Sequence, residues 1–474
     1  MKILYAASEA APFVKTGGLA DVAGSLPKAL NEAGAQTRVI LPLYSAIDLK
    51  WRERMTFLFH IDVKLSWRRQ YCGVFCLEHD GVTYYFLDNE YYFKRDSIYG
   101  CFDDGERFGF FSRAVVEAIP RLGWTPDIIH CNDWQTALVP IYLRYEIADV
   151  YRSIKSVFTI HNIEYQGRFG PGTAEDVFAL PQELCDSGII WYENDVNLMK
   201  GAIYESDSVT TVSPSYADEL QNPDFANGLH AVVESNSYKL SGILNGIDTV
   251  RYDPAKDPLL AKNYSAADLS GKSVCKAELC RELGLSDEPG TPIIACISRL
   301  VEHKGFALIT EALDEIIAKG ARLVIIGTGE ERLENFFRDA ENRYRGSVSA
   351  SIMYSESRAM RIYAGSDMLL MPSRSEPCGL SQMIAMRYGT VPIVREVGGL
   401  KDTVRNLGGE NANGFSFREY SASGLLGAVD FALRTYRGDP ATWRLIMLSD
   451  MTADLSWSSS AVSYINIYKR LMGN

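Results

Sequence analysis

Short apolar segments alternate with amphipathic segments along this chain, a pattern typical of βαβ units around a parallel sheet. A first series predicts strands over residues 3–7, 37–41, 127–131, 156–160 and 208–212. A second series predicts strands over 292–297, 322–326, 347–353, 367–371 and 391–394, with helices near 305–318, 330–343, 356–364, 379–388 and 421–436. Five strands in each series predict an α/β chain of two doubly wound domains that face each other.

Breaks in this alternation indicate the domain limits. Residues 55–88 contain strand-like runs without a helix between them, which predicts a β-meander attached to the first sheet. Residues 252–290 are polar and contain Asp-Pro pairs, which predicts a connection between the domains. We therefore expect a first domain over 1–241, a second over 242–455 and a terminal segment, 456–474, whose apolar residues recur at helical spacing.

Composition excludes several classes of function. The 474 residues exclude a single small module, and the formal charge of −12 disfavours nucleic acids and anionic membranes as partners. No apolar run approaches the roughly 18 residues of a membrane span, and the apolar run after Met1-Lys2 is too short for a signal peptide. Nine cysteines without a C-x-x-C pair and six scattered histidines predict neither disulfides nor a metal site. We expect a cytoplasmic protein.

Loops that follow strands are the expected ligand sites, because open α/β sheets bind ligands beyond the carboxyl ends of their strands. Lys15, Gly17 and Gly18 follow the predicted strand 3–7 and precede a helix. The glycines let backbone N–H groups approach a phosphate, and Lys15 adds a positive charge. The alternative is an ordinary glycine turn beside a surface lysine.

Two cations occupy the corresponding place in the second series. Arg299 ends the predicted strand 292–297, and Lys304 immediately precedes the next helix. An arginine fork and a lysine point charge can converge on one diphosphate. The alternative is a pair of solvated surface cations.

A carboxylate follows a later strand of the same series. Glu376 precedes Cys378, Gly379 and Leu380 at the predicted start of helix 379–388. A carboxylate beside free N–H groups can accept sugar hydroxyls and flank an anion, whereas the alternative is a simple helix cap. We interpret Cys378 as a packed residue rather than a nucleophile.

Polar residues also follow two strands of the first series. Asp133 comes after strand 127–131, and His161 and Asn162 come after strand 156–160, so adjacent parallel strands would bring them to one rim. The alternative for His161 is a buried, hydrogen-bonded histidine. Asn245 lies near the expected hinge, where it could also belong to a simple turn.

These loops together suit a nucleotide diphosphate-sugar held between two domains. The chain has no Walker A motif and no Asp-x-Asp pair, so we expect fixed cations rather than a metal to stabilise the leaving diphosphate.

The sequence resembles the bacterial and plastid starch/glycogen synthases, retaining glycosyltransferases of the GT-B architecture in glycosyltransferase family 5. The resemblance covers nearly the whole chain and is most specific in KTGGLADV at 15–22 and EPCGL at 376–380. It extends through HNI at 161–163, LNGID at 244–248, SRL at 298–300, RYGT at 387–390 and GGL at 398–400. It implies two facing Rossmann-like domains with an interdomain cleft, and a terminal helix that returns to the first domain.

The resemblance also implies an activity. It implies transfer of glucose from ADP-glucose to the nonreducing 4-hydroxyl of an α-1,4-glucan such as glycogen, with retention of configuration and without a cofactor. The implied donor-binding residues are Lys15, Gly17, Gly18, Asn162, Asn245, Arg299, Lys304, Glu376, Cys378, Gly379 and Leu380, and the implied catalytic residues are Asp133, His161, Arg299, Lys304 and Glu376. Related retaining families have a second carboxylate where this chain has Ile384.

Two other functions compete with this interpretation. No residue pattern in the sequence distinguishes a binding site for adenine from one for uracil, so a relative that uses UDP-glucose is one alternative. A noncatalytic protein that binds a sugar nucleotide or a glucan is the other, disfavoured because all four charged donor residues are present. Aromatic side chains at Tyr91, Tyr92, Phe93 and Tyr99 could add glucan-stacking sites on the first domain, or could belong to its core.

Overall fold

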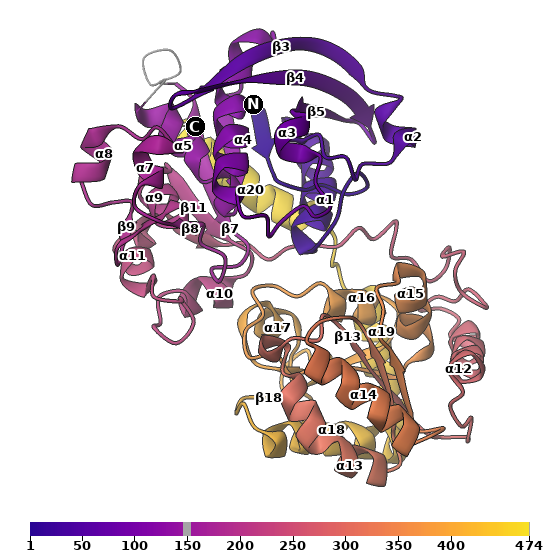
Figure 1. Ribbon diagram of the computed structural model, residues 1–474. Helices are drawn as coiled ribbons and strands as arrows, with labels where there is room; N and C mark the ends of the chain where they lie inside the picture. Colours follow the sequence, from indigo (N-terminus) through magenta and orange to yellow (C-terminus); the bar gives the residue numbers. More distant parts are fainter. Residues whose placement is uncertain (146–152, 474) are drawn as a thin grey trace. The chain divides into compact units, whose positions relative to one another are not determined.

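The computed structural model describes residues 1–145 and 153–473, which form two compact units (Figure 1). The first unit contains Met1–Gly246 and Trp457–Asn474, and the second contains Ile247–Ser456. The boundary falls five residues beyond the expected one, after the short strand β12 (Leu240–Gly242) has paired with the first sheet. The α/β fold with two domains, expected from the alternation of segments, is confirmed.

The first unit is built on one sheet of order β12-β11-β7-β6-β1-β2-β5-β4-β3. Its strands are β1 (Lys2–Ala6), β2 (Gln36–Pro42), β3 (Thr56–Leu65), β4 (Arg68–His79), β5 (Val82–Asp88), β6 (Ile128–Asn132), β7 (Lys155–Ile160) and β11 (Ser208–Thr211), besides β12. All neighbours from β12 to β5 are parallel, whereas β5, β4 and β3 are antiparallel. The meander therefore extends the parallel sheet at one edge.

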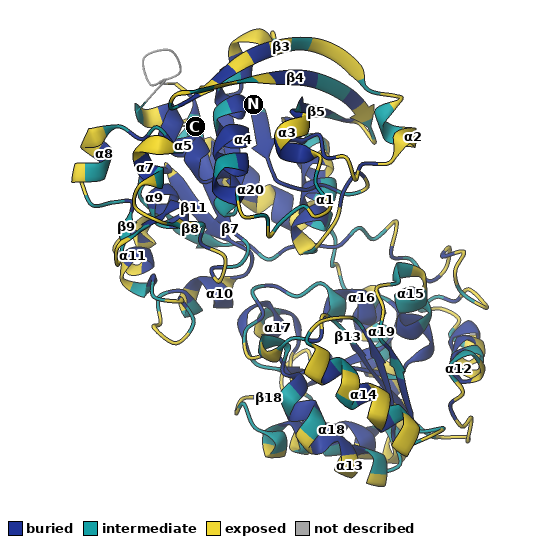
Figure 2. Ribbon diagram, viewed as in Figure 1, coloured by how far each residue is buried: buried dark blue, intermediate teal, exposed yellow. Residues whose placement is uncertain are grey.

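Helices cover the parallel part of this sheet, whose strands are buried (Figure 2). The longer ones are α1 (Gly18–Glu32), α4 (Asp104–Ala118), α5 (Leu138–Tyr145), α9 (Leu198–Glu205), α10 (Pro214–Glu219) and α11 (His230–Ser235). Single turns form α2 (Leu49–Arg52), α3 (Glu90–Phe93), α7 (Thr173–Asp176) and α8 (Gln182–Asp186), and a small antiparallel sheet joins β8 (Arg168–Phe169), β10 (Asp195–Asn197) and β9 (Trp191–Tyr192).

The terminal helix α20 (Trp457–Leu471) packs in the first unit, against α1 (Figure 1). Its buried side chains include Tyr464 and Tyr468. The Tyr468 hydroxyl hydrogen-bonds to Nδ1 of His130 at 2.7 Å, and Nε2 of His130 contacts Thr159 Oγ1 at 2.6 Å. The 15-residue helix is thus joined to the first sheet by a buried polar contact as well as by apolar packing.

The second unit contains a parallel sheet of order β15-β14-β13-β16-β17-β18. Its strands are β13 (Ile293–Ile297), β14 (Arg322–Ile326), β15 (Val348–Ser351), β16 (Met368–Met371), β17 (Val391–Arg395) and β18 (Phe415–Phe417). Its helices are α12 (Ser270–Leu283), α13 (Phe306–Ala318), α14 (Glu331–Arg343), α15 (Glu356–Gly365), α16 (Ser381–Arg387), α17 (Gly398–Thr403), α18 (Ala422–Gly438) and α19 (Pro440–Thr452). Renumbered along the chain, this order is 3-2-1-4-5-6, the doubly wound order of dinucleotide-binding domains.

The polar segment 252–290 is more structured than expected. It contains α12, which buries Cys275, Leu279 and Cys280 and ends at Gly284 with a left-handed φ of 65°. Glycine favours this conformation at the end of a helix. The strong turn signals around α12 therefore concealed a helix that packs against α15.

In the part of the chain that the structure describes, no helix is long and apolar enough to cross a membrane.

One buried carboxylate in the second unit leads to a stability prediction. Asp450, on α19, is fully buried, and neither carboxylate oxygen has a hydrogen-bond partner among the described residues. Burial raises its pKa well above the ordinary value. The folded protein therefore holds a proton that the unfolded chain releases above about pH 4, and stability falls as the pH rises from there.

Asp450→Asn is expected to remove this pH dependence. At pH 8 it should raise the free energy of unfolding by about 1–3 kcal/mol, with a smaller gain at pH 5. Asp439→Ala is the matched control on the same helix, because Asp439 caps α19 by accepting a hydrogen bond from the Thr442 amide. The control should lower the melting temperature at both pH values. Equal melting temperatures of wild type and Asp450→Asn at pH 8 would contradict the prediction.

Candidate functional site

The second unit gathers its predicted site residues at one edge of its sheet. Arg299 and Lys304 follow β13, and Glu376 follows β16. These two strands are neighbours in the sheet, but the chain reverses its winding direction between them. Such a switch point opens a crevice at the carboxyl ends of the strands, which is where ligands bind in open α/β sheets.

Lys304 and Glu376 form a close ion pair at this edge. Nζ of Lys304 donates to both Glu376 carboxylate oxygens at 2.7 Å, and the Ser373 hydroxyl donates to Oε2 at 3.0 Å. The Glu376 side chain is 7% exposed and that of Lys304 is 18% exposed. The residues were expected to bind different parts of a ligand, yet in this structure each is the partner of the other. Arg299 is exposed.

Close backbone contacts hold these loops together. Gly305, with a φ of 77°, lies so near the Pro372 carbonyl that a Cβ atom would meet its oxygen at 2.0 Å. Gly327 and Gly329, after β14, lie equally close to the carbonyls of Ser298 and Leu300. A Cβ atom at these two positions would meet the carbonyl oxygens at 1.9 and 2.1 Å. Glycine is therefore required at positions that set the paths of the Arg299 and Lys304 loops. The Gly327-Thr328-Gly329 turn thus has a packing role.

The loop after Glu376 has a similar support. Gly398 and Gly399 begin α17 directly against the carbonyls of Glu376 and Cys378. Cys378 is 5% exposed, in keeping with a packed residue. Gly379 has a φ of 72°, and the helix α16 begins at Ser381, two residues later than expected. Leu380 is the residue that precedes it.

The first unit gathers its candidates at the corresponding switch point, between β1 and β6. Gly17 and Gly18 lie where α1 begins, and Lys15 forms an ion pair with Asp21 at 2.7 Å. The loop is held from beneath by Glu9, which is 3% exposed and accepts hydrogen bonds from the Thr16 amide and hydroxyl. Sequence reasoning missed the role of Glu9, because only the folded loop brings Thr16 to it.

Asp133, His161 and Asn162 meet at the rim of the first sheet, as expected. Oδ1 of Asp133 accepts the backbone N–H of His161 at 2.7 Å and that of Asn162 at 3.4 Å. Asp133 also has a left-handed φ of 56°, which is costly for a residue other than glycine and is typical of functional sites. Burial raises the pKa of Asp133 to about 7, although these two hydrogen bonds oppose the shift.

The imidazole of His161 is neutral. Burial lowers its pKa to about 3, and its Nε2 lies 2.8 Å from Oδ1 of Asn132. The Asn132 amide group donates to the Ala6 carbonyl, which fixes Oδ1 as the acceptor. Nε2 therefore carries the proton, and His161 can orient or accept at Nδ1 but holds no positive charge at neutral pH.

Two positions remain: Asn245, a predicted donor contact, and Ile384, which stands where related families have a second carboxylate. Asn245 follows β12 and directly precedes Gly246, where the chain leaves the first unit. Ile384 lies on α16 with 7% exposure.

The aromatic side chains proposed as glucan-stacking sites are mostly internal. Tyr92 and Phe93 are 0% and 1% exposed and belong to the core. Tyr99 is half-buried, and its hydroxyl contacts the Ser8 hydroxyl at 2.7 Å. Tyr91 alone of the four is exposed, at 64%. Of the two alternatives for these aromatic residues, a place in the core is therefore the correct one for Tyr92 and Phe93.

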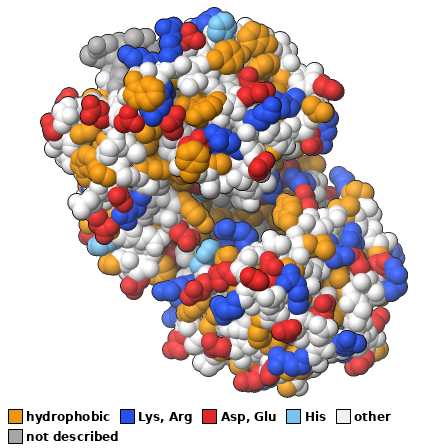
Figure 3. Space-filling view, viewed as in Figure 1, with side chains coloured by type: hydrophobic (Ala, Val, Ile, Leu, Met, Phe, Trp, Pro, Cys, Tyr) orange, Lys and Arg blue, Asp and Glu red, His pale blue; other side chains and the backbone are white. Residues whose placement is uncertain are grey.

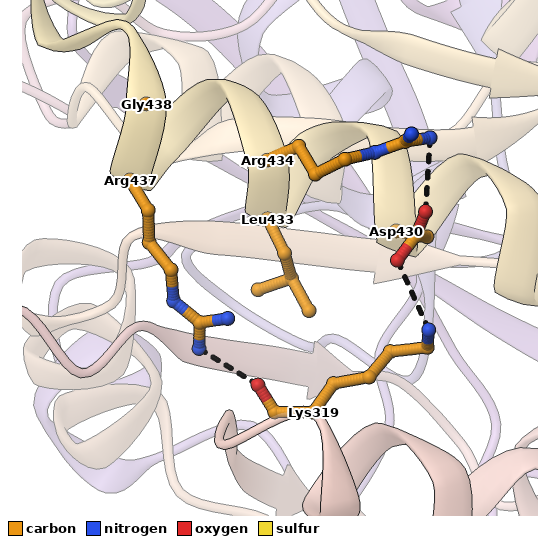
Figure 4. A pocket seen from close by; sticks show the side chains of 6 residues that line it. All are labelled: Lys319, Asp430, Leu433, Arg434, Arg437 and Gly438. Atoms are coloured by element: carbon orange, nitrogen blue, oxygen red, sulfur yellow. Dashed lines mark hydrogen bonds and ion pairs between the residues drawn. The ribbon is translucent and has the colours of Figure 1, made fainter.

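A cavity of about 350 Å³ lies elsewhere on the second unit (Figure 4). Lys319 and Arg434 both pair with Asp430, at 3.0 and 2.9 Å, and Arg437 donates to the Lys319 carbonyl. Lys319 precedes β14, so this cavity lies at the amino end of the strands, opposite Arg299 and Glu376. Its cations are used in ion pairs and helix-end contacts. Among residues 1–145 and 153–473, no group of three acidic, histidine or cysteine side chains is placed to hold a metal.

A pair of doubly wound units, one with a cation and a carboxylate at its switch point, defines a class of proteins: the glycosyltransferases with two Rossmann-like domains. Family models agree, since "Starch synthase catalytic domain" matches residues 2–235 and "Glycosyl transferases group 1" matches 285–440. The chain belongs to the glycogen and starch synthase family.

Full-length relatives support the assignment of the chain to this family. The glycogen synthase of Clostridium beijerinckii is 44% identical and that of Bacillus cereus strain ATCC 10987 is 46% identical, with complete coverage of both chains in each comparison. The catalytic domain of starch synthase IV from Arabidopsis thaliana, solved bound to ADP and acarbose, has 35% identity and a TM-score of 0.93 over 100% of this chain and 99% of that chain. Sucrose-phosphate synthase from Thermosynechococcus elongatus, 18% identical with a TM-score of 0.62, shares the fold.

Proposed function

We propose that this protein transfers glucose from ADP-glucose to the nonreducing 4-hydroxyl of an α-1,4-glucan, with retention of configuration. The observation that carries the proposal is the Lys304–Glu376 pair at the switch point of the second sheet, beside the exposed Arg299. Support for the donor comes from the relative solved with ADP, and support for the acceptor comes from the relatives named as glycogen synthases. The proposed place of action is the cytoplasm.

The chemistry assigned to the second unit follows from its charges. Retaining transfer passes through an oxocarbenium-like transition state while negative charge develops on the departing diphosphate. Arg299 and Lys304 are proposed to stabilise that charge. Glu376, together with the backbone amides of residues 378–380, is proposed to bind the hydroxyls of the transferred glucose. We propose that these fixed cations act without a metal.

The roles proposed for the first unit depend more on the positioning of side chains than on their charge. Lys15 and the Gly17-Gly18 turn are proposed to contact the donor, with Asn162 and Asn245 as further donor contacts. Asp133 holds the backbone of residues 161 and 162, so its proposed role is to orient His161 toward the transferred sugar. Because His161 is neutral, we propose that it accepts or orients a hydroxyl rather than acting as a cation.

A donor comparison tests this function against its two alternatives. Incorporation of labelled glucose into glycogen would be measured from ADP-glucose and from UDP-glucose, each with and without primer. We expect incorporation that depends on primer and is much faster from ADP-glucose. Faster incorporation from UDP-glucose would refute the proposed donor, and no incorporation from either would favour a noncatalytic binding protein.

A further inference from the structure

Trp67 is displayed at the tip of a hairpin where a tryptophan is unexpected. Ser66 and Trp67 form the two-residue turn between β3 and β4, and Trp67 is 74% exposed. Ser66 has a φ of 54°, although two-residue hairpin turns favour glycine or asparagine where φ is positive. A strained backbone at Ser66 and a large exposed apolar ring at Trp67 therefore occur in the same turn. This combination is typical of functional positions.

The exposed ring is held in place from one side. The Arg68 guanidinium lies over it, 4.3 Å from the ring, and the indole Nε1 donates to Oδ1 of Asp176 at 2.8 Å. Arg68, whose side chain is only 13% exposed, also pairs with Asp176 at 3.3 Å and with Glu106 at 3.1 Å. The ring is therefore fixed before any ligand arrives, which lowers the entropy lost on binding.

The groups around the ring suit a neutral sugar. The indole face that Arg68 does not cover can pack on the apolar C–H face of a pyranose, while the Asp176 carboxylate beside Nε1 can accept from a hydroxyl and the Arg68 guanidinium can donate to one. Hydrogen bonds from Trp67 and Arg68 lower the pKa of Asp176, so its carboxylate is ionised at neutral pH. On the drawn face of this unit, hydrophobic side chains lie in separate patches among charged ones (Figure 3).

We propose that Trp67, Arg68 and Asp176 form a glucan-docking site that is separate from the site of glucose transfer. The identity of the occupant rests on the proposed function. Among the described residues, the side chains of Trp67, Arg68 and Asp176 form hydrogen bonds and ion pairs with one another and with Glu106, and with none of the residues proposed to act in glucose transfer. A polymeric acceptor bound here would be retained near the enzyme between transfers, whereas a short oligosaccharide would gain nothing.

β-Cyclodextrin is the probe for this site, because it is a closed α-1,4-glucan without a nonreducing end and cannot accept glucose. Its affinity would be measured by calorimetry for the wild type, Trp67→Ala, Trp67→Tyr and Tyr238→Ala. Tyr238 is the matched control: it is 83% exposed, with a lysine 5.9 Å from its ring. Transfer to maltotetraose would be measured on the same four proteins.

We expect Trp67→Ala to weaken cyclodextrin binding by about tenfold or more, the effect of losing a central aromatic contact. Trp67→Tyr should retain binding within about threefold, Tyr238→Ala should bind like the wild type, and all four should extend maltotetraose equally. Unchanged binding by Trp67→Ala would overturn the proposal. So would a dimer that Trp67→Ala dissociates without loss of cyclodextrin binding. If the wild type transfers no glucose but Trp67→Ala loses the cyclodextrin, the proposed function fails and the docking site stands.

Discussion

Lys304→Ala is expected to lower kcat for glucose transfer about 10³-fold, with a much smaller change in the KM for ADP-glucose. In the proposed mechanism Lys304 stabilises charge that grows on the diphosphate as the glycosidic bond breaks, so its removal affects the transition state more than the bound donor. The substitution also leaves Glu376 buried without its cation, since Lys304 donates to both carboxylate oxygens. Steady-state kinetics with saturating glycogen measure both parameters.

Lys319→Ala is the matched control for this experiment. Lys319 also forms an ion pair, with Asp430 at 3.0 Å, but it lies at the opposite end of the strands. The control should leave kcat within about twofold of the wild type, because exposed pairs contribute little. If Lys304→Ala raised only the KM and left kcat unchanged, Lys304 would be a binding residue without a role in the transition state.

Glu376→Gln is expected to separate donor binding from transfer. In this structure two of the three N–H donors of the Lys304 ammonium group point at the Glu376 carboxylate, so the negative charge of Glu376 opposes the approach of a diphosphate to that ammonium group. The neutral amide removes that competition, and we expect the affinity for ADP to rise about three- to tenfold, the range of a modest charge-pair contribution. Transfer should fall at least about 10²-fold, because the variant loses a charge-assisted hydrogen bond to the sugar.

Calorimetry with ADP and single-turnover transfer measure these two effects on one preparation. Ser373→Ala is the matched control, since Ser373 donates to the same carboxylate at 3.0 Å and carries no charge. It should change ADP affinity by less than about twofold, in keeping with a neutral hydrogen bond. Weaker ADP binding by Glu376→Gln would contradict the competition that the structure indicates.

The role of Glu376 also bears on the route of the reaction. Retention can arise from attack on the same face that the leaving group departs from, or from two successive displacements through a glucosyl-enzyme. We favour same-face attack, in which the departing diphosphate assists the incoming hydroxyl. Trapping a glucosyl group on Glu376 would overturn this preference.

The sequence predicted the regular interior of the fold better than its edges. The expected range 322–326 matches β14 residue for residue, because a short apolar run there lies between two glycine turns. The helix α20 falls within the expected terminal segment, because its apolar residues recur at helical spacing. The edge strands β12 and β18, with three residues each, are too short for periodicity to reveal. The helix α12 was missed because its polar surface and the prolines around it resemble a linker.

The candidate site could be located but not assembled from the sequence. Strand ends and glycine turns pointed to the loops that carry Lys15, Arg299 and Glu376. Contacts between loops far apart in the chain followed only from the fold, and the pairing of Lys304 with Glu376 is the main example. The buried support from Glu9 is another, because a single glutamate in a sequence has no feature that separates it from a surface residue.

Analysis of the reaction product tests the central claim most directly. The wild type would be incubated with ADP-glucose and maltotetraose, and the new linkage examined by proton NMR while ADP release is followed. We predict maltopentaose with a new α-1,4 linkage at the nonreducing end, formed in equal amount to ADP. A β-linked product, or ADP release with free glucose and no longer oligosaccharide, would contradict the account.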